Sequence, residues 1–154
     1  MNGVVQWKRG QTGWPLVDAC MRELSATGFI SHAARTNVSS FLAQDLAIDW
    51  RMGAEHFDAQ LVDADPCSNY CNWQLAAGVS RESEKHRRGI RQQSIRLDKS
   101  ASYIKRWVPE LKPLPPPTVH EMNGRDCSFE TRAFGVVLGE TYPKPISRSQ
   151  WRYH

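Results

Sequence analysis

The sequence predicts an all-α protein, and three observations carry that prediction. Apolar residues recur at three- and four-residue spacing through the first half of the chain, which is the period of a helix with one buried face. The Val, Ile and Thr alternation that is typical of strands is absent from that half. The chain has 154 residues, of which 40% are hydrophobic and 23% charged, and this suffices for one compact core. We therefore expect a helical bundle.

Four helices are predicted in the first half, each with its own start or stop signal. Pro15 begins the first and Gly28 ends it. The second covers residues 34–47, the third is capped by Asp49, and the fourth covers residues 67–77. The apolar residues expected to face inward are Leu16, Val17, Cys20, Leu24, Val38, Phe41, Leu42, Leu46, Met52, Phe57 and Leu61.

The positive charge of the chain is concentrated in one segment. The net charge is +4, yet residues 80–106 hold nine Lys or Arg against three Asp or Glu, so this segment carries +6 and the rest −2. A basic stripe of this kind neutralises phosphates of nucleic acid or acidic protein and membrane surfaces. A solvated arginine-rich loop is an equally good interpretation. A basic helix or turn is expected over residues 84–95.

The last third of the chain is rich in proline. A short helix over residues 100–107 should end at Pro109. The run at 111–117 is expected to cross the surface in extended form, because proline fits neither a helix interior nor a central strand. Residues 134–138 are assigned to a short strand or helix, and residues 142–146 to a second extended segment.

The four cysteines are too few and too scattered for a disulfide scaffold, which favours a reducing compartment. Cys67 and Cys71 lie one helical turn apart, a spacing that suits a metal or a redox pair, but no Cys or His cluster supplies further ligands. We expect them to be small buried residues on one helix.

Membrane and targeting signals are not recognised. No run approaches the roughly 18 apolar residues of a spanning helix, and the N-terminal residues lack the layout of a signal peptide. Removal of a plastid or mitochondrial presequence before residue 1 is an alternative that stays open. These features therefore do not determine the compartment.

Several polar residues do not suit a plain helical core. Asp63, Asp65 and Asn69 lie within seven residues of one another, and Arg35 is on a helix that can pack nearby. A buried arginine with carboxylates forms a planar, bidentate arrangement able to hydrogen-bond a polar heterocycle. A structural ion pair is the alternative interpretation.

Two tryptophans, Trp50 and Trp73, occupy neighbouring predicted helices. Indole rings in van der Waals contact can pass an electron, or they can simply fill a core. The residues alone leave both interpretations open.

Many dispersed residues agree in order and spacing with one known family. They include Trp7 to Ala19, Met21 to Gly28, Ser39 to Leu42, Ile48 to Glu55, Asp63 to Asp65, Cys67-Ser-Asn-Tyr70, Asn72-Trp73 and Tyr103 to Leu111. Together they resemble the C-terminal flavin-binding domain of the cryptochrome/photolyase family, and the DASH cryptochromes above all. The resemblance assigns residues 1–111 to a partial FAD-binding domain, with the basic segment at 80–106, and leaves residues 112–154 as an extended Pro-rich tail.

The resemblance implies a helical domain that holds FAD in a U-shape over a DNA-facing pocket. By position, Arg35 and Asp63 would form a salt bridge beside the isoalloxazine ring, and Asp65 would accept a hydrogen bond from the ring or its ribityl neighbourhood. Asn69 would face the flavin N5 atom.

The resemblance also implies roles in electron transfer and DNA contact. Trp73 would be the nearest electron donor to the flavin, with Trp50 next. Gln93 matches a family position that touches DNA, and the surrounding basic residues Arg87, Arg88 and Arg91 suit phosphate contacts.

Some positions depart from the family pattern. His32-Ala33 stands where the family has Asn-Arg, so a fixed charge is lost on the DNA side. Cys71, Gly89 and Ala101 replace the usual Gly, Asn and Gly. The family's N-terminal half, with the antenna domain, the phosphate-binding loop, the adenine-binding helix and the third tryptophan, is not recognised in this chain.

These departures shape the predicted function. Half a pocket should lose most of its affinity for FAD, and uncovered apolar faces cost about 25 cal/mol per Å². We therefore predict a truncated flavin-domain protein that has lost FAD and serves as a non-catalytic subunit of a larger assembly. Should flavin bind, Asp63→Ala should be costly because it strands a buried Arg35.

Two alternatives stay open. One is an FAD-dependent blue-light photoreceptor or DNA photolyase completed by a second chain. The other is a nucleic-acid-binding module that uses residues 80–106. The DASH resemblance favours a plastid or mitochondrion, with cytoplasm and nucleus open. The roles of His32 and of the tail are not assigned.

Overall fold

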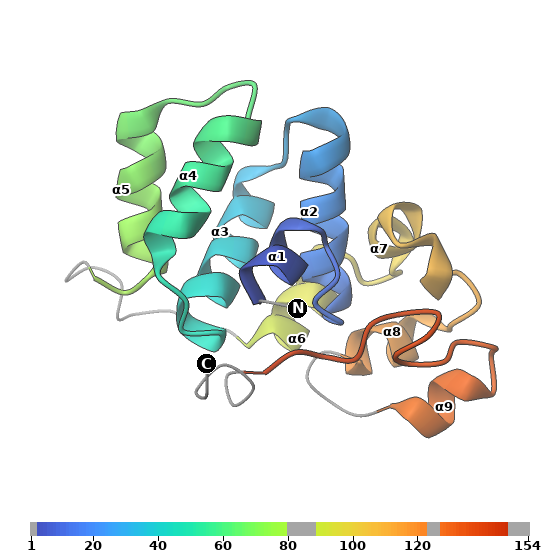
Figure 1. The fold of residues 1–154 in the computed structure, drawn as a ribbon. Coiled ribbons are helices and arrows are strands. Elements are labelled where there is room, and N and C mark those ends of the chain that lie inside the picture. The colour runs from blue at the N-terminus through green and yellow to red at the C-terminus, as the bar shows by residue number, and fades with distance from the viewer. Residues whose placement is uncertain (1–2, 80–88, 123–126, 148–154) are drawn as a thin grey trace.

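The structure, a computed structural model, describes residues 3–79, 89–122 and 127–147 (Figure 1). Within these ranges the β structure is a single bridge between Leu138 and Tyr142, so the all-α prediction is confirmed. The elements are α1 (Gly3–Lys8), α2 (Pro15–Thr27), α3 (His32–Ser40), the π-helix η1 (Phe41–Asp45), α4 (Trp50–Gln60), α5 (Pro66–Ala76), α6 (Ile90–Leu97), α7 (Ser102–Trp107), the 3₁₀-helix η3 (Pro109–Leu111), α8 (Pro116–Glu121) and α9 (Ser128–Arg132).

The helices α5, α4, α3 and α2 stand side by side across the molecule (Figure 1). Helix α4 packs along α5, α3 contacts both α2 and α5, and α7 packs against α2 at the far side of the row. Helices α6 and α8 contact each other below it. No helix of the described ranges is long and apolar enough to cross a membrane.

All but one of the apolar residues predicted to face inward are buried. The exception is Met52, whose side chain is 41% exposed. The buried face of helix α4 consists of Gly53, Ala54 and Phe57. Met52 lies outside this face and its side chain is directed to solvent. The apolar pattern gave the helix and the buried positions Phe57 and Leu61 correctly, and it misplaced Met52 alone.

The helix predicted at 34–47 is α3 followed by η1. The helix begins at His32, two residues before the predicted start. The Ser31 hydroxyl caps it by accepting a hydrogen bond from the Ala34 N–H at 3.2 Å. The π turn closes with a bond from the Leu46 N–H to the Phe41 carbonyl at 3.0 Å. Both Phe41 and Leu42 are completely buried there.

Helix α5 also corrects the prediction for its cysteines. It buries Asn69 and Trp73, which lie one turn apart, so the positions two residues earlier face the other way. Cys67 and Cys71 are therefore exposed, not buried. In the described part of the chain, no group of three or more His, Cys, Asp or Glu could hold a metal ion.

The extended conformation expected beyond Leu111 is wrong in two places, because residues 116–121 and 128–132 are helical. Pro116 and Pro117 occupy the first turn of α8, where a missing N–H costs nothing. Leu114 is buried in the core, so this run does not simply cross the surface. The domain division at 111 stays a prediction.

Other expectations for the second half have mixed outcomes. The basic helix expected at 84–95 is α6 from Ile90 onward, and residues 80–88 lie outside the described ranges. The short helix expected at 100–107 is α7. Residues 134–138 form neither strand nor helix. Of the segment predicted at 142–146, Tyr142 belongs to the bridge with Leu138 and residues 143–146 are in neither helix nor strand.

Ala101, one departure from the family pattern, lies in the left-handed region with φ 55°. This conformation costs an L residue about 1–2 kcal/mol. The turn is held because the Asp98 carbonyl accepts from the Ala101 N–H at 2.8 Å and the Asp98 carboxylate accepts from the Ile104 N–H at 2.9 Å.

The two ends of the described chain are joined through the buried carboxylate of Asp18 on α2. It accepts from the Thr12 N–H at 2.7 Å, the Thr12 hydroxyl at 2.6 Å and the Gly13 N–H at 3.0 Å. It also accepts from the Tyr142 hydroxyl at 2.5 Å. Burial raises the pKa of Asp18, and the bonds from Thr12 and Tyr142 oppose that shift. We call this set of contacts the Asp18 clasp.

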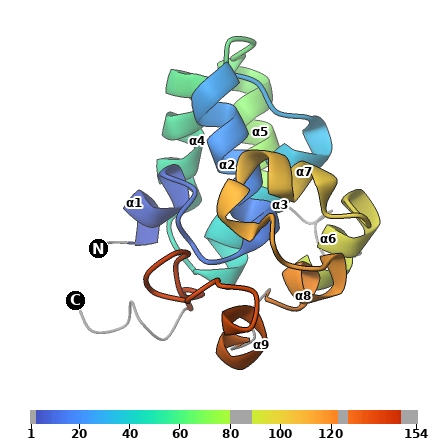
Figure 2. The same cartoon turned by 90° about the vertical axis from the view of Figure 1, so that its right-hand side faces the viewer.

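Backbone contacts extend the clasp. The Ile146 N–H donates to the Thr12 carbonyl at 2.9 Å, and the Trp14 indole N–H donates to the Ile146 carbonyl at 3.0 Å. A Cβ at Gly13 would lie 2.5 Å from the Lys144 carbonyl carbon. Figure 2 shows the C-terminal segment, in red, beside the blue loop that follows α1. The segment is thus part of the core.

Asp18→Ala should lower the free energy of unfolding by about 3 kcal/mol or more, because it leaves several buried donors without a partner. Tyr142→Phe removes one of the four bonds and should cost only about 1 kcal/mol. Urea unfolding of both variants measures the difference. Equal losses in the two variants would contradict the central place of Asp18.

Candidate functional site

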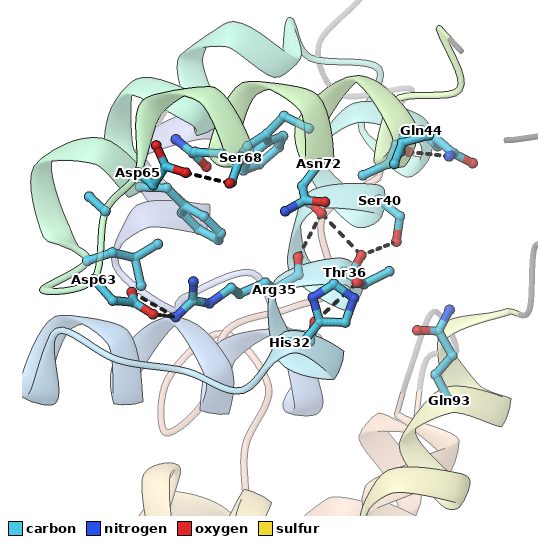
Figure 3. A pocket seen from close by; sticks show the side chains of 18 of the residues that line it. His32, Arg35, Thr36, Ser40, Gln44, Asp63, Asp65, Ser68, Asn72 and Gln93 are labelled. Atoms are coloured by element: carbon cyan, nitrogen blue, oxygen red, sulfur yellow. Dashed lines mark hydrogen bonds and ion pairs between the residues drawn. The ribbon is translucent and has the colours of Figure 1, made fainter. Parts of the chain in front are cut away.

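A cavity of about 440 Å³ lies between α3 and α5 (Figure 3). Four parts of the chain form its walls: α3 with η1, the end of α4 with the loop that follows, α5, and the start of α6. The residues predicted from sequence that line it are Arg35, Asp63, Asp65, Asn69, Trp73 and Gln93. Residues far apart in sequence therefore meet at one place, and Trp50 is not among them.

Arg35 and Asp63 form an ion pair at the cavity wall (Figure 3). Nη2 of Arg35 donates to both Asp63 oxygens, at 2.9 and 2.8 Å, and its Nε donates to the Ile30 carbonyl at 2.9 Å. The side chains are 26% and 47% exposed. The salt bridge that the resemblance implies is therefore present, but it is partly exposed and one nitrogen serves both oxygens, so the expectation of a buried, planar fork is wrong.

Asp65 precedes α5 and is exposed. Its carboxylate accepts from the Ser68 hydroxyl (Figure 3). Hydrogen bonds from the Ser68 side chain, from its backbone and from the Cys67 backbone lower the pKa of Asp65. Asp65 is thus an anionic acceptor at neutral pH, already engaged with the first turn of α5.

Trp73 forms the aromatic wall of the cavity and is almost completely buried. Its ring lies edge-on to Phe57 at 5.1 Å and to Trp7 at 5.9 Å between centroids. Helix α4 can approach it because residue 53 is glycine: a Cβ there would lie 2.1 Å from Cη2 of Trp73. Within the described ranges, the indole nitrogen of Trp73 has no hydrogen-bond partner.

Trp50 lies apart from this wall. Its ring lies edge-on to Tyr70 at 6.0 Å, and the Arg51 guanidinium covers it at 4.9 Å. Among the described residues no aromatic contact joins Trp50 to Trp73. The electron-transfer roles of the two tryptophans stay predictions.

Of the four residues predicted to contact nucleic acid, the structure describes Arg91 and Gln93, both on α6. Gln93 lines the cavity and accepts from the Asn37 side chain at 2.8 Å. Arg91 is exposed and paired with Glu121 at 2.8 Å. Arg87 and Arg88 lie outside the described residues.

Sequence reasoning missed several polar residues of the lining, among them Ser39, Gln44 and Asn72. Gln44 donates to the Ala76 carbonyl at the end of α5 and so ties η1 to the opposite wall. It also missed Gly53, although an isolated glycine inside a helical pattern signals a close approach. The cavity thus offers a guanidinium, carboxylates, amides and hydroxyls around an aromatic wall, which suits a flat heterocycle with a polar edge.

Residues 2–152 match the family described as the FAD binding domain of DNA photolyase, and the chain belongs to this family. The match runs past the 7–111 stretch that carried the resemblance. The chain is similar to DASH cryptochromes: it is 48% identical to cryptochrome DASH of Gloeobacter violaceus over 91% of its length, which is 28% of that relative. Cryptochrome DASH of Xenopus laevis is 45% identical over 96% of the chain and 28% of the relative.

Solved structures of the same family are similar to this chain. A Synechocystis cryptochrome has a TM-score of 0.86 at 44% identity, covering 95% of this chain and 30% of that one. An archaeal photolyase from Sulfolobus tokodaii, solved with two FAD molecules, has a TM-score of 0.79 at 38% identity, covering 93% and 31%. The chain thus corresponds to under a third of these relatives.

Gly53→Ala should cost about 1–3 kcal/mol of stability, because the new methyl group overpacks a Trp73 ring that cannot move away. Near-UV circular dichroism and urea unfolding measure the effect. Gly89→Ala is the matched control, since nothing lies within 4 Å of a Cβ there, and it should change stability by less than about 0.5 kcal/mol. An unchanged Trp73 environment in Gly53→Ala would contradict the contact.

Asp63→Ala should cost no more than about 1 kcal/mol, because the pair it breaks is partly exposed. This replaces the larger loss expected for a buried pair. The loss should shrink further in concentrated salt, which thermal unfolding at two ionic strengths measures. A loss of about 3 kcal/mol would show that Arg35 becomes buried without a partner.

Proposed function

We propose that this chain forms the part of an FAD site that receives the isoalloxazine ring, in a blue-light flavoprotein of the cryptochrome/photolyase kind. Polypeptide outside the 154 residues would supply the rest of the site. One observation carries the proposal: Arg35, Asp63, Asp65 and Asn69 line a single cavity together with Trp73. These are the residues that the family resemblance assigns to the ring.

The chemistry of the lining supports a flavin ring. Arg35 offers a hydrogen-bond donor to a ring carbonyl, Asn69 and Asp65 offer oxygens to ring or ribityl donors, and Trp73 offers an aromatic face. Bound FAD would supply blue-light absorption and one-electron chemistry. In this proposal Trp73 is the first electron donor because it lines the cavity, and Trp50 follows on the strength of the resemblance alone.

The same lining does not suit the FAD pyrophosphate. Among the described lining residues, the one Lys or Arg side chain is Arg35, which is paired with Asp63. Asp45 and Asp65 line the cavity too, and carboxylates disfavour a dianion. We therefore propose that this chain alone does not retain FAD, since much of the affinity has to come from elsewhere.

The purified chain should show no visible absorbance of oxidised flavin and no light-driven DNA repair. Mixing it with a DASH cryptochrome from which the matching segment has been deleted should restore stoichiometric flavin. Arg35→Ala in this chain should weaken that restoration about tenfold, as loss of a charge-assisted bond to the ring predicts. The exposed Arg106→Ala serves as control.

The outcomes separate the proposals. A yellow chain on its own would overturn the claim that FAD is not retained. Failure of every combination to take up flavin would overturn the flavin site.

A non-catalytic structural subunit is the second candidate, and exposed apolar side chains favour it. Phe129 is 91% exposed, Val62 78% and Val79 65%. Exposed apolar side chains of this kind are typical of surfaces that bind a partner. Stable co-purification with a larger assembly that contains no flavin would support this role. The organellar location also stays a proposal: plant relatives such as that of Solanum lycopersicum are named chloroplastic/mitochondrial, while bacterial and animal relatives match as well.

The nucleic-acid role of residues 80–106 has weaker support. Arg91 already has a carboxylate partner, so the charge available to phosphates is smaller than the sequence count indicates. Binding through this segment would fall steeply with salt, and salt-insensitive or absent binding would eliminate it.

A further inference from the structure

The two exposed cysteines of α5 lie on the same side of one rigid helix. Cys67 and Cys71 are one turn apart, and both are exposed. The opposite side of α5 is fixed against α4, because the Trp73 ring occupies the space beside Gly53 and the Asn69 amide donates to a backbone carbonyl of α4 at 2.9 Å. Helix α5 stands at the end of the row of helices (Figure 1). The helix therefore sets the spacing of two thiols that solvent can reach.

This spacing opposes a disulfide between the two cysteines. Residues four apart on a helix have Cβ atoms about 5–6 Å apart, whereas a disulfide needs Cβ atoms about 3.5–4.5 Å apart and sulfurs about 2.0 Å apart. A metal ion lies about 2.3 Å from each thiolate sulfur that binds it. Two sulfurs on opposite sides of one ion are thus about 4.6 Å apart. The one-turn spacing fits a bridge of one metal atom and not a direct bond.

The number of available ligands decides which ion fits this pair. Across residues 3–79, 89–122 and 127–147, no group of three or more His, Cys, Asp or Glu could hold a metal ion. The pair therefore has no third ligand of these types within those ranges. Structural zinc sites take four such ligands, and calcium and magnesium take oxygen ligands. Thiolates select Cu(I) among the soft ions, and Cu(I) is stable between two sulfurs in a line.

We propose that Cys67 and Cys71 form a two-thiolate site for a soft monovalent ion of the Cu(I) class. On binding, two S–H bonds break, two S–Cu bonds form and two protons pass to the buffer; no group is oxidised or reduced. Both cysteines are outside the cavity lining, so the site is separate from the proposed flavin site. By the family resemblance, Cys71 replaces a glycine, which makes the pair a feature of this chain.

The site is tested by titrating the reduced full chain with Cu(I) under anaerobic conditions, in competition with a coloured Cu(I) chelator. One ion should bind per chain, with near-ultraviolet absorbance of a copper–thiolate bond and release of two protons. Cys67→Ser and Cys71→Ser should each weaken binding about a hundredfold, because the second thiolate of the pair acts at a high effective concentration. Cys71→Gly should weaken it equally.

Two control variants on α5 separate the geometry from the mere presence of thiols. Gln74→Ala changes an exposed residue of the same helix and should leave the affinity unchanged. The double variant Cys71→Ser with Gln74→Cys keeps two thiols on α5 but places them about 10 Å apart along the helix. This distance is too long for one ion, so the double variant should bind as weakly as Cys71→Ser. Far-UV circular dichroism checks that each variant stays helical.

A thiol reagent tests the same site without any substitution. Two thiols of the native chain should react fast, because Cys20 and Cys127 are buried. One equivalent of Cu(I) should protect both fast thiols, and neither should be lost to an intrachain disulfide when the folded chain stands in air.

Several outcomes would overturn the site, and none of them depends on flavin. They are undiminished affinity in Cys67→Ser, in Cys71→Ser or in the double variant, and one ion shared by two chains in size-exclusion chromatography. Failure of Cu(I) to protect the two fast thiols would overturn it even where a variant does not fold. Rapid formation of a disulfide between Cys67 and Cys71 in the folded chain would contradict the spacing argument.

Discussion

The close approach of α4 and α5 at Gly53 is the constraint on which the candidate site depends. The Trp73 ring occupies the space of a missing side chain, and this contact sets the distance between the two helices. At that distance the Asn69 amide reaches Ala54 and Asp58, and the loop between the helices holds Asp63 opposite Arg35. The part of the cavity wall that α4 and α5 contribute thus depends on the contact between Gly53 and Trp73.

The Asp18 clasp is the corresponding constraint for the whole domain, because it joins two parts of the chain that are distant in sequence. Its carboxylate takes donors from the loop before α2 and from Tyr142 near the end of the described chain. A buried carboxylate is tolerated only when it is satisfied in this way. The segment at 142–146 consequently belongs to the core, with Tyr142 and Ile146 buried in it, although two prolines in five residues are typical of a surface linker.

Most of the helices could be predicted because their signals are local. Pro15 at the start of α2 and Gly28 after it act within a single turn. The structure differs from the prediction where a contact between residues distant in sequence determines the orientation of a side chain. Met52 faces solvent because α4 turns Gly53 toward Trp73. No local pattern carries such information.

The sequence by itself determined the helical class, the family and some of the polar residues that line the cavity, because residue types and their spacing carry these properties. Only the tertiary structure decided that Arg35 and Asp63 form a partly exposed pair, that Trp73 lies against Trp7, and that Cys67 is exposed. Orientation and burial depend on groups from helices distant in sequence, and those groups meet only when the chain packs.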